Sequence, residues 1–234
     1  MKALALGLAI LVQGATEPPM AQPNTLTAAE KRAGWKLLFD GRTTEGWRGF
    51  KAPAPDRGWH VAEGALSPDP KASKDIMTKE MFGDFELAFE WRIGPKGNSG
   101  VMYRVTADGD QTYWSGPEFQ VLDNSRGEPP QQRAGALYDL YPPARDLTKP
   151  VGEYNESRIA IRRGHVEHWL NGVKIVEYEL WSPEWEKKVQ ASKFAKWPGY
   201  GRAKAGHIAL QDHGDPVAFR NLKIKATSPS GTRD

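Results

Sequence analysis

The chain has 234 residues, 39% hydrophobic and 26% charged, a composition that argues against a disordered chain or a bundle of membrane helices. It contains no cysteine, which excludes disulfides and every metal site built on thiolates. Its 32 Lys and Arg residues are interleaved with 29 Asp and Glu residues, leaving a net charge of +3 and no basic stripe, so a nucleic-acid partner is not expected.

Residues 1–15 have the pattern of a signal peptide. Lys2 precedes an apolar run from Ala3 to Val12, and small residues follow at Gly14 and Ala15. The run is too short to span a bilayer, and no cysteine is available for a lipid anchor. We therefore expect a periplasmic or secreted mature chain that is not inserted in a membrane; the alternative is a cytosolic protein with an apolar start.

Three regions follow this leader. Residues 16–33 are predicted to be a lead-in segment, loosely helical over 25–32. Residues 34–226 are predicted to form one domain, because no linker and no internal repeat interrupts them. Residues 227–234 are rich in Ser, Pro and Gly and are predicted to be a flexible tail.

Apolar and polar residues alternate through most of residues 34–226, which is the pattern of half-buried strands. The clearest case is 85–93, with an apolar face of Phe85, Leu87, Phe89, Trp91 and Ile93. Asn171-Gly172 predicts a tight hairpin turn. Further strands are predicted at 101–105, 118–122, 158–162, 166–170, 173–180, 208–213 and 219–224.

One helix interrupts the strands. Ser182 is a suitable N-cap, Pro183 suits the first turn, and the helix is predicted to run to about Ala195. Many short strands with one short helix predict an all-β fold, a two-sheet antiparallel β-sandwich or jelly roll.

The common catalytic and cofactor-binding motifs are absent: the sequence has no His-Glu-x-x-His, no P-loop, no Gly-x-Ser-x-Gly and no Gly-x-Gly-x-x-Gly. His165 and His168 bracket a predicted strand, and a structural or surface role is favoured over a metal site for this pair. No metal ligand and no cofactor are assigned.

The polar faces of the predicted strands carry the chemically informative residues Arg104, Glu118, Gln120, Gln211 and His213. Amides and carboxylates match sugar hydroxyls, which both donate and accept hydrogen bonds. The alternative is ordinary solvation of an outward face.

Aromatic residues and loops add further candidates. Nine tryptophans are present, either as core residues or as stacking surfaces for a ring-shaped ligand. Trp114 precedes the 118–122 strand, Asn98 precedes the 101–105 strand, and Tyr138 and Asn155 lie in turn-like stretches. The alternative for these stretches is turn chemistry alone.

An ordered series of segments resembles the 3-keto-disaccharide hydrolase family over roughly residues 34–225. The segments are Gly34–Gly41 with Gly46-Trp47, Asn98–Arg104, Glu118–Asp123, Ala134–Leu140, Lys149–Glu153, Val166–Gly172, Gln211–Gly214 and Phe219–Asn221. One departure from the family pattern is Tyr154, where Trp is expected.

The resemblance implies a concanavalin A-like sandwich that cleaves 3-keto-glycosides. A ketone at C3 acidifies the C2 proton, so a base can remove it, the C1 oxygen can leave, and water can add back. This differs from the two-carboxylate displacement of ordinary glycosidases. The alternative is a non-catalytic carbohydrate-binding module, since fold does not fix function.

The resemblance also implies roles for the candidate residues. Glu118 or His213 would be the base or the acid, and Arg104 and Gln211 would polarise the carbonyl or anchor hydroxyls. Ring-holding and other substrate contacts are assigned to Trp114, Tyr138, Gln120, Asn98, Asn155 and Asp123. The expected partner is a small carbohydrate.

Overall fold

The computed structural model describes residues 22–69 and 74–227. The predicted signal peptide and residues 228–234 of the predicted tail lie outside the described residues. In chain order the elements are α1 (Ala28–Arg32), β1 (Lys36–Leu37), β2 (Trp47–Gly49), β3 (Trp59–Ala62), β4 (Ala65–Pro68), β5 (Ile76–Thr78), β6 (Phe85–Ile93), β7 (Asn98–Val105), η1 (Thr112–Trp114), β8 (Glu118–Leu122), η2 (Asn124–Arg126), η3 (Pro130–Gln132), β9 (Asn155–Arg162), β10 (His165–Leu170), β11 (Val173–Glu179), α2 (Pro183–Gln190), η4 (Lys193–Lys196), β12 (His207–Leu210) and β13 (Val217–Ala226), where η marks a 3-10 helix.

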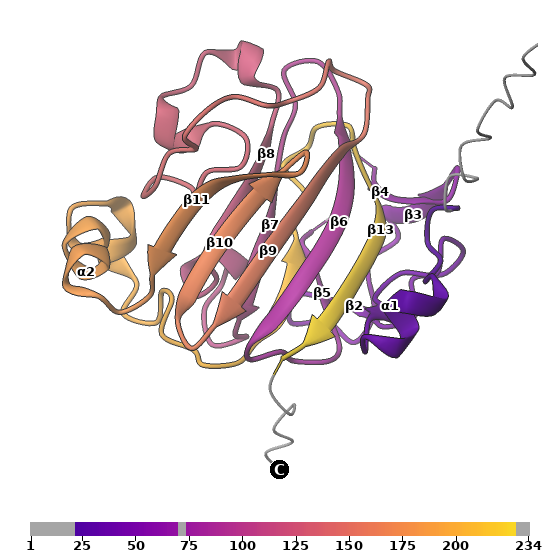
Figure 1. The fold of residues 1–234 in the computed structure, drawn as a ribbon, viewed down its shortest axis with the longest axis horizontal. Helices are drawn as coiled ribbons and strands as arrows, with labels where there is room; N and C mark the ends of the chain where they lie inside the picture. Colours follow the sequence, from indigo (N-terminus) through magenta and orange to yellow (C-terminus); the bar gives the residue numbers. More distant parts are fainter. Residues whose placement is uncertain (1–21, 70–73, 228–234) are drawn as a thin grey trace, which may run out of the picture.

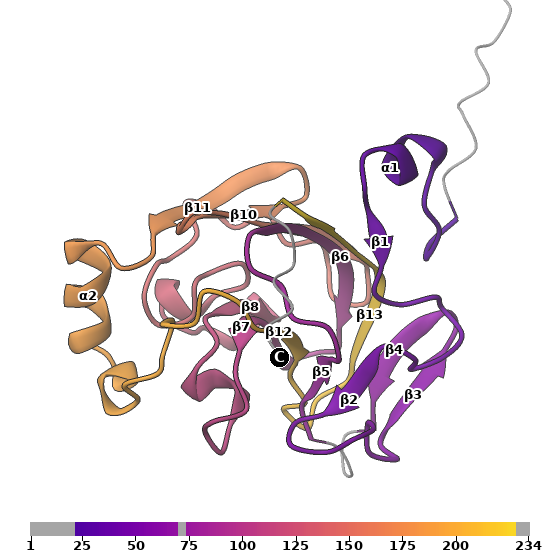
Figure 2. The same cartoon turned by 90° about the horizontal axis from the view of Figure 1, so that it is seen from below.

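The strands of the described residues form two antiparallel sheets. The larger has the order β11-β10-β9-β6-β13-β4-β3, with β1 paired to β13, and the smaller has the order β2-β5-β12-β7-β8. Figure 1 looks onto the larger sheet, and Figure 2 shows the two layers with α1 and α2 at opposite ends. The prediction of a two-sheet antiparallel β-sandwich is confirmed.

Strand β6 shows how the alternating sequence builds the core. Phe85, Leu87, Phe89, Trp91 and Ile93 are each at most 4% exposed and belong to the main hydrophobic cluster. Burying each such side chain contributes roughly 1.5–3 kcal/mol. The indole N–H of Trp91 donates to the Ser157 hydroxyl at 2.9 Å, so its one polar group is satisfied inside the core.

The hairpin turn between β10 and β11 is the one predicted. Asn171 and Gly172 have φ angles of 48° and 82°. Both central residues of a type I′ turn need positive φ, which is why the Asn-Gly pair favours this connection.

Helix α2 begins as predicted but ends earlier. The Ser182 side chain accepts a hydrogen bond from the backbone N–H of Trp185 at 3.1 Å, and α2 ends at Gln190 rather than near Ala195. Ser192 then caps η4 through the backbone N–H of Phe194. The chain turns here because a second cap interrupts the helix.

Strand β8 is buried on both faces, unlike an ordinary edge strand. Phe119 and Val121 face the core, whereas Glu118 and Gln120, on the opposite face, are only 5% and 2% exposed. Residues 134–138 run along this strand, and their backbone hydrogen-bonds to it at Glu118 and Gln120. The predicted polar face of β8 is therefore buried rather than in open solvent.

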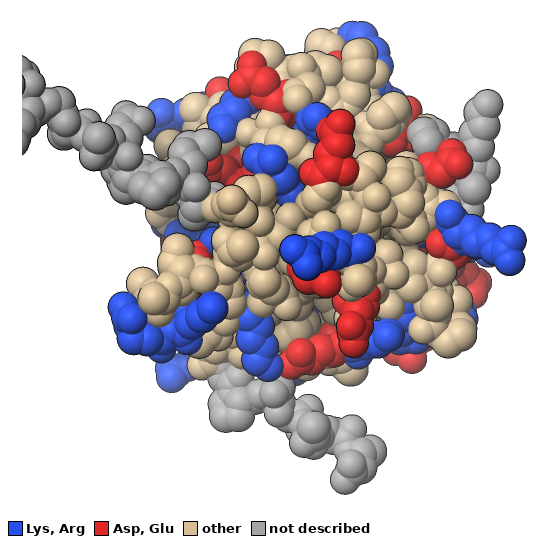
Figure 3. Space-filling view, turned by 90° about the vertical axis from the view of Figure 1, so that its right-hand side faces the viewer, with Lys and Arg blue, Asp and Glu red and all other residues tan. Residues whose placement is uncertain are grey.

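The surface carries charges of both signs. Figure 3 shows Lys and Arg interspersed with Asp and Glu on one side of the molecule. Among the described helices, none has the length and apolar character needed to cross a bilayer.

Candidate active site

A pocket of about 290 Å³ lies on the face of the smaller sheet that points away from the core. We call it the Glu118 pocket. Six predicted site residues line it together with three that were not predicted: Asn98, Glu118, Gln120, Tyr138, Gln211 and His213, with Tyr113, Lys193 and Trp197. Strands β7 and β8 and the segment after β12 thus bring side chains far apart in the sequence to one place.

The floor of the pocket is a set of amides. The Gln120 side-chain N–H₂ donates to the Asn98 side-chain oxygen at 3.2 Å and to the Gln132 carbonyl at 3.3 Å. The Gln120 side-chain oxygen is buried and has no hydrogen-bond partner among the described residues. An acceptor that is buried without a partner costs about 1–3 kcal/mol of stability.

Glu118 is the buried acid of the pocket. No hydrogen bond joins its carboxyl group to another side chain in the described part of the chain. Burial raises its pKa to about 8, although the positive charge of Lys193 opposes the shift. Gly100 of β7 lies beside it, and a Cβ atom there would overlap the carboxyl group, so any larger residue would displace the Glu118 side chain.

Aromatic rings form the walls. Tyr113 comes from η1, Tyr138 from the segment beside β8, and Trp197 follows η4. The rings of Tyr113 and Trp197 meet edge to face with centroids 5.4 Å apart, and the Lys193 ammonium lies 4.3 Å from the centre of the Tyr138 ring. Flat rings beside amides and a carboxyl group suit a pyranose, which has apolar C–H faces and a polar rim.

Asp75 supports two of these walls and was not predicted. Its carboxylate accepts hydrogen bonds from the Thr112 hydroxyl and from the backbone N–H of Asp212, the latter at 3.1 Å. These partners adjoin Tyr113 and His213. Burial raises the pKa of Asp75 to about 6. One carboxylate thus connects η1 to the segment after β12.

Arg104 does not reach the Glu118 pocket, contrary to the prediction. Opposite β12, strand β7 holds one extra residue between Met102 and Val105, and Arg104 has a φ of 54°. Such a bulge reverses the face of the residues that follow it. The guanidinium instead pairs with Asp84 at 3.0 Å, donates to the Gly83 carbonyl and is 2% exposed.

Three other predicted residues also lie outside the lining of the Glu118 pocket. Trp114 stacks on Trp197, with ring centroids 5.6 Å apart at 18°. Asn155 lies on β9 of the larger sheet, where its side-chain oxygen accepts from the backbone N–H of Lys149 at 2.8 Å. Asp123 caps η2 and accepts from the backbone N–H of Ser125 at 2.9 Å. Asn155 and Asp123 thus hold backbone turns in place.

Tyr154 likewise lies outside the pocket, so its replacement of the expected Trp changes no pocket wall. Its ring packs against the guanidinium of Arg220, 3.7 Å from the ring centre.

The two histidines of β10 have different surroundings, and neither lines the Glu118 pocket. His168 is fully buried, and burial lowers its pKa to about 4. Its Nδ1 donates to the Gly135 carbonyl at 2.9 Å, and its Nε2 accepts from the Tyr103 hydroxyl at 3.0 Å.

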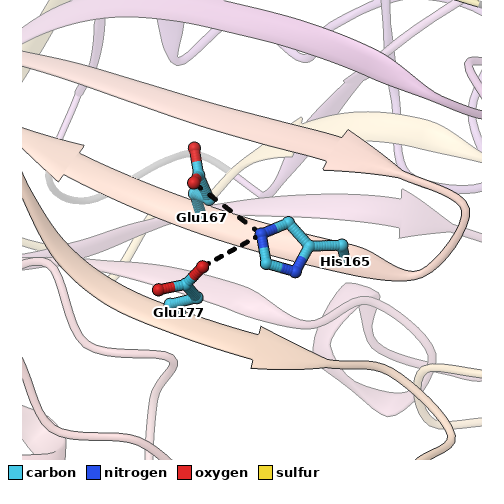
Figure 4. Close-up of side chains that lie close together, drawn as sticks. All are labelled: His165, Glu167 and Glu177. Carbon is cyan, nitrogen blue, oxygen red and sulfur yellow. Dashed lines mark ion pairs between the residues drawn. The ribbon is translucent and has the colours of Figure 1, made fainter.

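The one group among the described residues with metal-ligand spacing consists of His165, Glu167 and Glu177 (Figure 4). Lys174 already pairs with both glutamates, at 3.1 and 2.8 Å, so this group is a surface ion-pair network.

The sequence gives little indication that Tyr113, Lys193 and Trp197 belong to the pocket. Tyr113 adjoins the predicted Trp114, and Trp197 follows shortly after the predicted end of the helix near Ala195. Their neighbours in space come from distant strands, so spacing along the chain could not assign them to one pocket.

The fold and the pocket together define a carbohydrate-active β-sandwich. The chain belongs to the family of 3-keto-alpha-glucoside-1,2-lyase-like domains, whose model matches residues 34–225.

Individual relatives agree with this membership. A 3-keto-disaccharide hydrolase from Bacteroides thetaiotaomicron is 33% identical over 91% of this chain and 88% of its own length. A crystal structure described as a candidate glycosyl hydrolase from Parabacteroides distasonis is 33% identical with a TM-score of 0.82, covering 88% of this chain and 100% of that one. Another from the same organism is 27% identical with a TM-score of 0.64, covering 82% and 98%.

Proposed function

We propose that this protein cleaves the glycosidic bond of 3-keto-glycosides, including 3-keto-disaccharides, by elimination followed by addition of water. The family match and the name of the Bacteroides thetaiotaomicron relative support the substrate class. The Glu118 pocket supports it chemically, since it combines an acid, an imidazole and several amides between aromatic walls.

The proposed reaction has two balanced stages. A base removes the proton from C2, and the electron pair forms an enolate with the C3 ketone. The enolate re-forms the ketone, a C1=C2 double bond forms, and the C1–O bond breaks as the leaving oxygen takes a proton. Water then adds its hydroxyl to C1 and a proton to C2, so that the sum is hydrolysis.

The observation that carries this proposal is the buried carboxyl group of Glu118. With a pKa raised by burial to about 8, the group holds its proton near pH 7. A neutral carboxylic acid facing the pocket can protonate the leaving oxygen. His213 then serves as the base, and Gln211 and Lys193 offer donors for the enolate oxygen.

Reaction in D₂O tests the route directly. We expect the protein to cleave 3-keto-trehalose and 3-keto-sucrose but not the unoxidised sugars, and to leave one deuterium on C2 of the product after its hydroxyl groups are exchanged back in H₂O. Mass spectrometry and NMR measure both results, with an enzyme-free incubation to correct for spontaneous enolisation. Cleavage without C2 deuterium would refute elimination, and binding without cleavage would favour a carbohydrate-binding module.

Variants test the assigned residues. Glu118→Gln and His213→Ala should each lower turnover on the order of 100-fold. His165→Ala, which changes a histidine outside the pocket, is the matched control and should leave turnover unchanged. Near-wild-type rates in both pocket variants would refute the assignment.

We also propose that the chain is exported. The support is the apolar run that follows Lys2 in residues 1–15. Mass spectrometry of the chain recovered from its native cells should find an N-terminus beyond this run; a chain that begins at Met1 would contradict export.

A further inference from the structure

A second pocket, of about 360 Å³, adjoins the Glu118 pocket and shares Trp197 with it. We call it the Trp114 pocket. Its lining includes Thr106, Asp108, Trp114, Lys196, Trp197 and Gly199. One indole ring therefore borders both hollows.

The same two short segments build both pockets. In η1, Tyr113 faces the Glu118 pocket while its neighbour Trp114 faces the Trp114 pocket. In η4, Lys193 lines the first pocket and Lys196 the second. Because Thr112 is held by Asp75, η1 is anchored to the sheet, and the two pockets have a common support.

Several side chains of the Trp114 pocket have free hydrogen-bonding capacity, although the Ser115 hydroxyl is used within the protein. The indole N–H groups of Trp114 and Trp197 donate to no group in the described part of the chain. The side chains of Thr106, Asp108 and Lys196 likewise make no hydrogen bond or ion pair within residues 22–69 and 74–227. An aromatic surface with unused donors and acceptors at its rim is the chemistry that binds a sugar ring.

We propose that the Trp114 pocket is a second sugar subsite, which holds the ring released when the glycosidic bond breaks. This inference rests on the proposed function. The buried acid Glu118 and the imidazole of His213 line only the first pocket, so the 3-keto ring must react there. The ring on the other side of the scissile bond then occupies the neighbouring pocket across Trp197.

Gly199 allows the subsite to be blocked without disturbing the first pocket. No heavy atom of the described residues outside its chain neighbours lies within 4 Å of a Cβ added at Gly199, and its φ is not in the left-handed region. Gly199→Leu therefore adds a bulky apolar side chain at the lining of the Trp114 pocket without backbone strain. Ala195→Leu is the matched control, since Ala195 is exposed on η4 and lines neither pocket.

The test compares kcat/KM for 3-keto-trehalose with that for methyl 3-keto-glucoside, whose leaving group is only methanol. Gly199→Leu should lower kcat/KM for the disaccharide roughly tenfold or more and leave the methyl glycoside within about twofold, as expected for loss of one pocket's contacts. Ala195→Leu should change neither value.

Two results would overturn the subsite: equal losses on both substrates, or no loss on the disaccharide. If circular dichroism shows that Gly199→Leu is misfolded, the double variant Thr106→Ala and Lys196→Ala is measured in the same way. If the wild-type protein cleaves neither substrate, the proposed function fails, and calorimetric binding of the same two sugars to wild type and variant then decides the subsite separately.

Discussion

Burying the carboxyl group of Glu118 predicts a strong dependence of stability on pH. Its pKa is about 8 in the folded chain, against 4.5 for the unburied group. The folded state therefore keeps a proton that the unfolded state loses, and stability present below pH 4.5 is lost as the pH rises to about 8. The pKa difference corresponds to a total loss of about 5 kcal/mol of stability once the pH is above 8, of which about 3 kcal/mol is already lost at pH 7. This is a large share of the free energy of unfolding of a folded domain, which is typically roughly 5–15 kcal/mol.

Glu118→Gln removes this titration while keeping the shape of the side chain. Between pH 5 and 8 the free energy of unfolding of the wild type should fall relative to that of the variant by about 1.4 kcal/mol per pH unit. Urea denaturation at pH 5, 7 and 9 measures the difference. Glu153→Gln removes an exposed carboxylate and is the control. Parallel curves for wild type and Glu118→Gln would refute the assigned burial.

The pocket floor, the buried ion pair and the wall support each yield one further prediction. Gly100→Ala places a methyl group against the Glu118 carboxyl group and should lower kcat/KM on the order of 100-fold, while the circular dichroism spectrum stays unchanged. An unchanged kcat/KM would contradict the close approach of Gly100 to Glu118. Arg104→Ala removes the ion-pair partner of Asp84, which keeps its hydrogen bond from the backbone N–H of Arg163, and should lower the free energy of unfolding by about 3 kcal/mol in urea. Its effect on kcat should be smaller than that of Glu118→Gln, and a larger effect would show that Arg104 acts in the active site. Asp75→Asn replaces an acceptor with a donor between two wall segments and should raise KM several-fold with a smaller change in kcat, whereas a loss confined to kcat would point to a direct chemical role.

Much of the candidate site follows from side-chain alternation. Phe119 and Val121 had to face the core, which left Glu118 and Gln120 on the other face of β8. Gln211 and His213 continue beyond β12, and both line the pocket. Alternation is a local property, so a single strand is enough to reveal it.

The same reasoning failed at Arg104 because a bulge is a property of two paired strands. Simple alternation puts the Arg104 side chain on the same face of the sheet as Met102. The extra residue of β7 opposite β12 moves it to the other face. Nothing in residues 98–105 alone indicates the partner strand or its register.

Local sequence patterns predict the two-sheet sandwich, the β10–β11 hairpin, the start of α2 and the polar face of β8, because each depends on neighbours within a few residues. The folded structure was needed to show that this face is buried, that burial raises the pKa of Glu118, and that Lys193 and Trp197 line the same pocket. Those properties depend on which distant segments exclude water from the carboxyl group, and desolvation by such segments has no local sequence pattern.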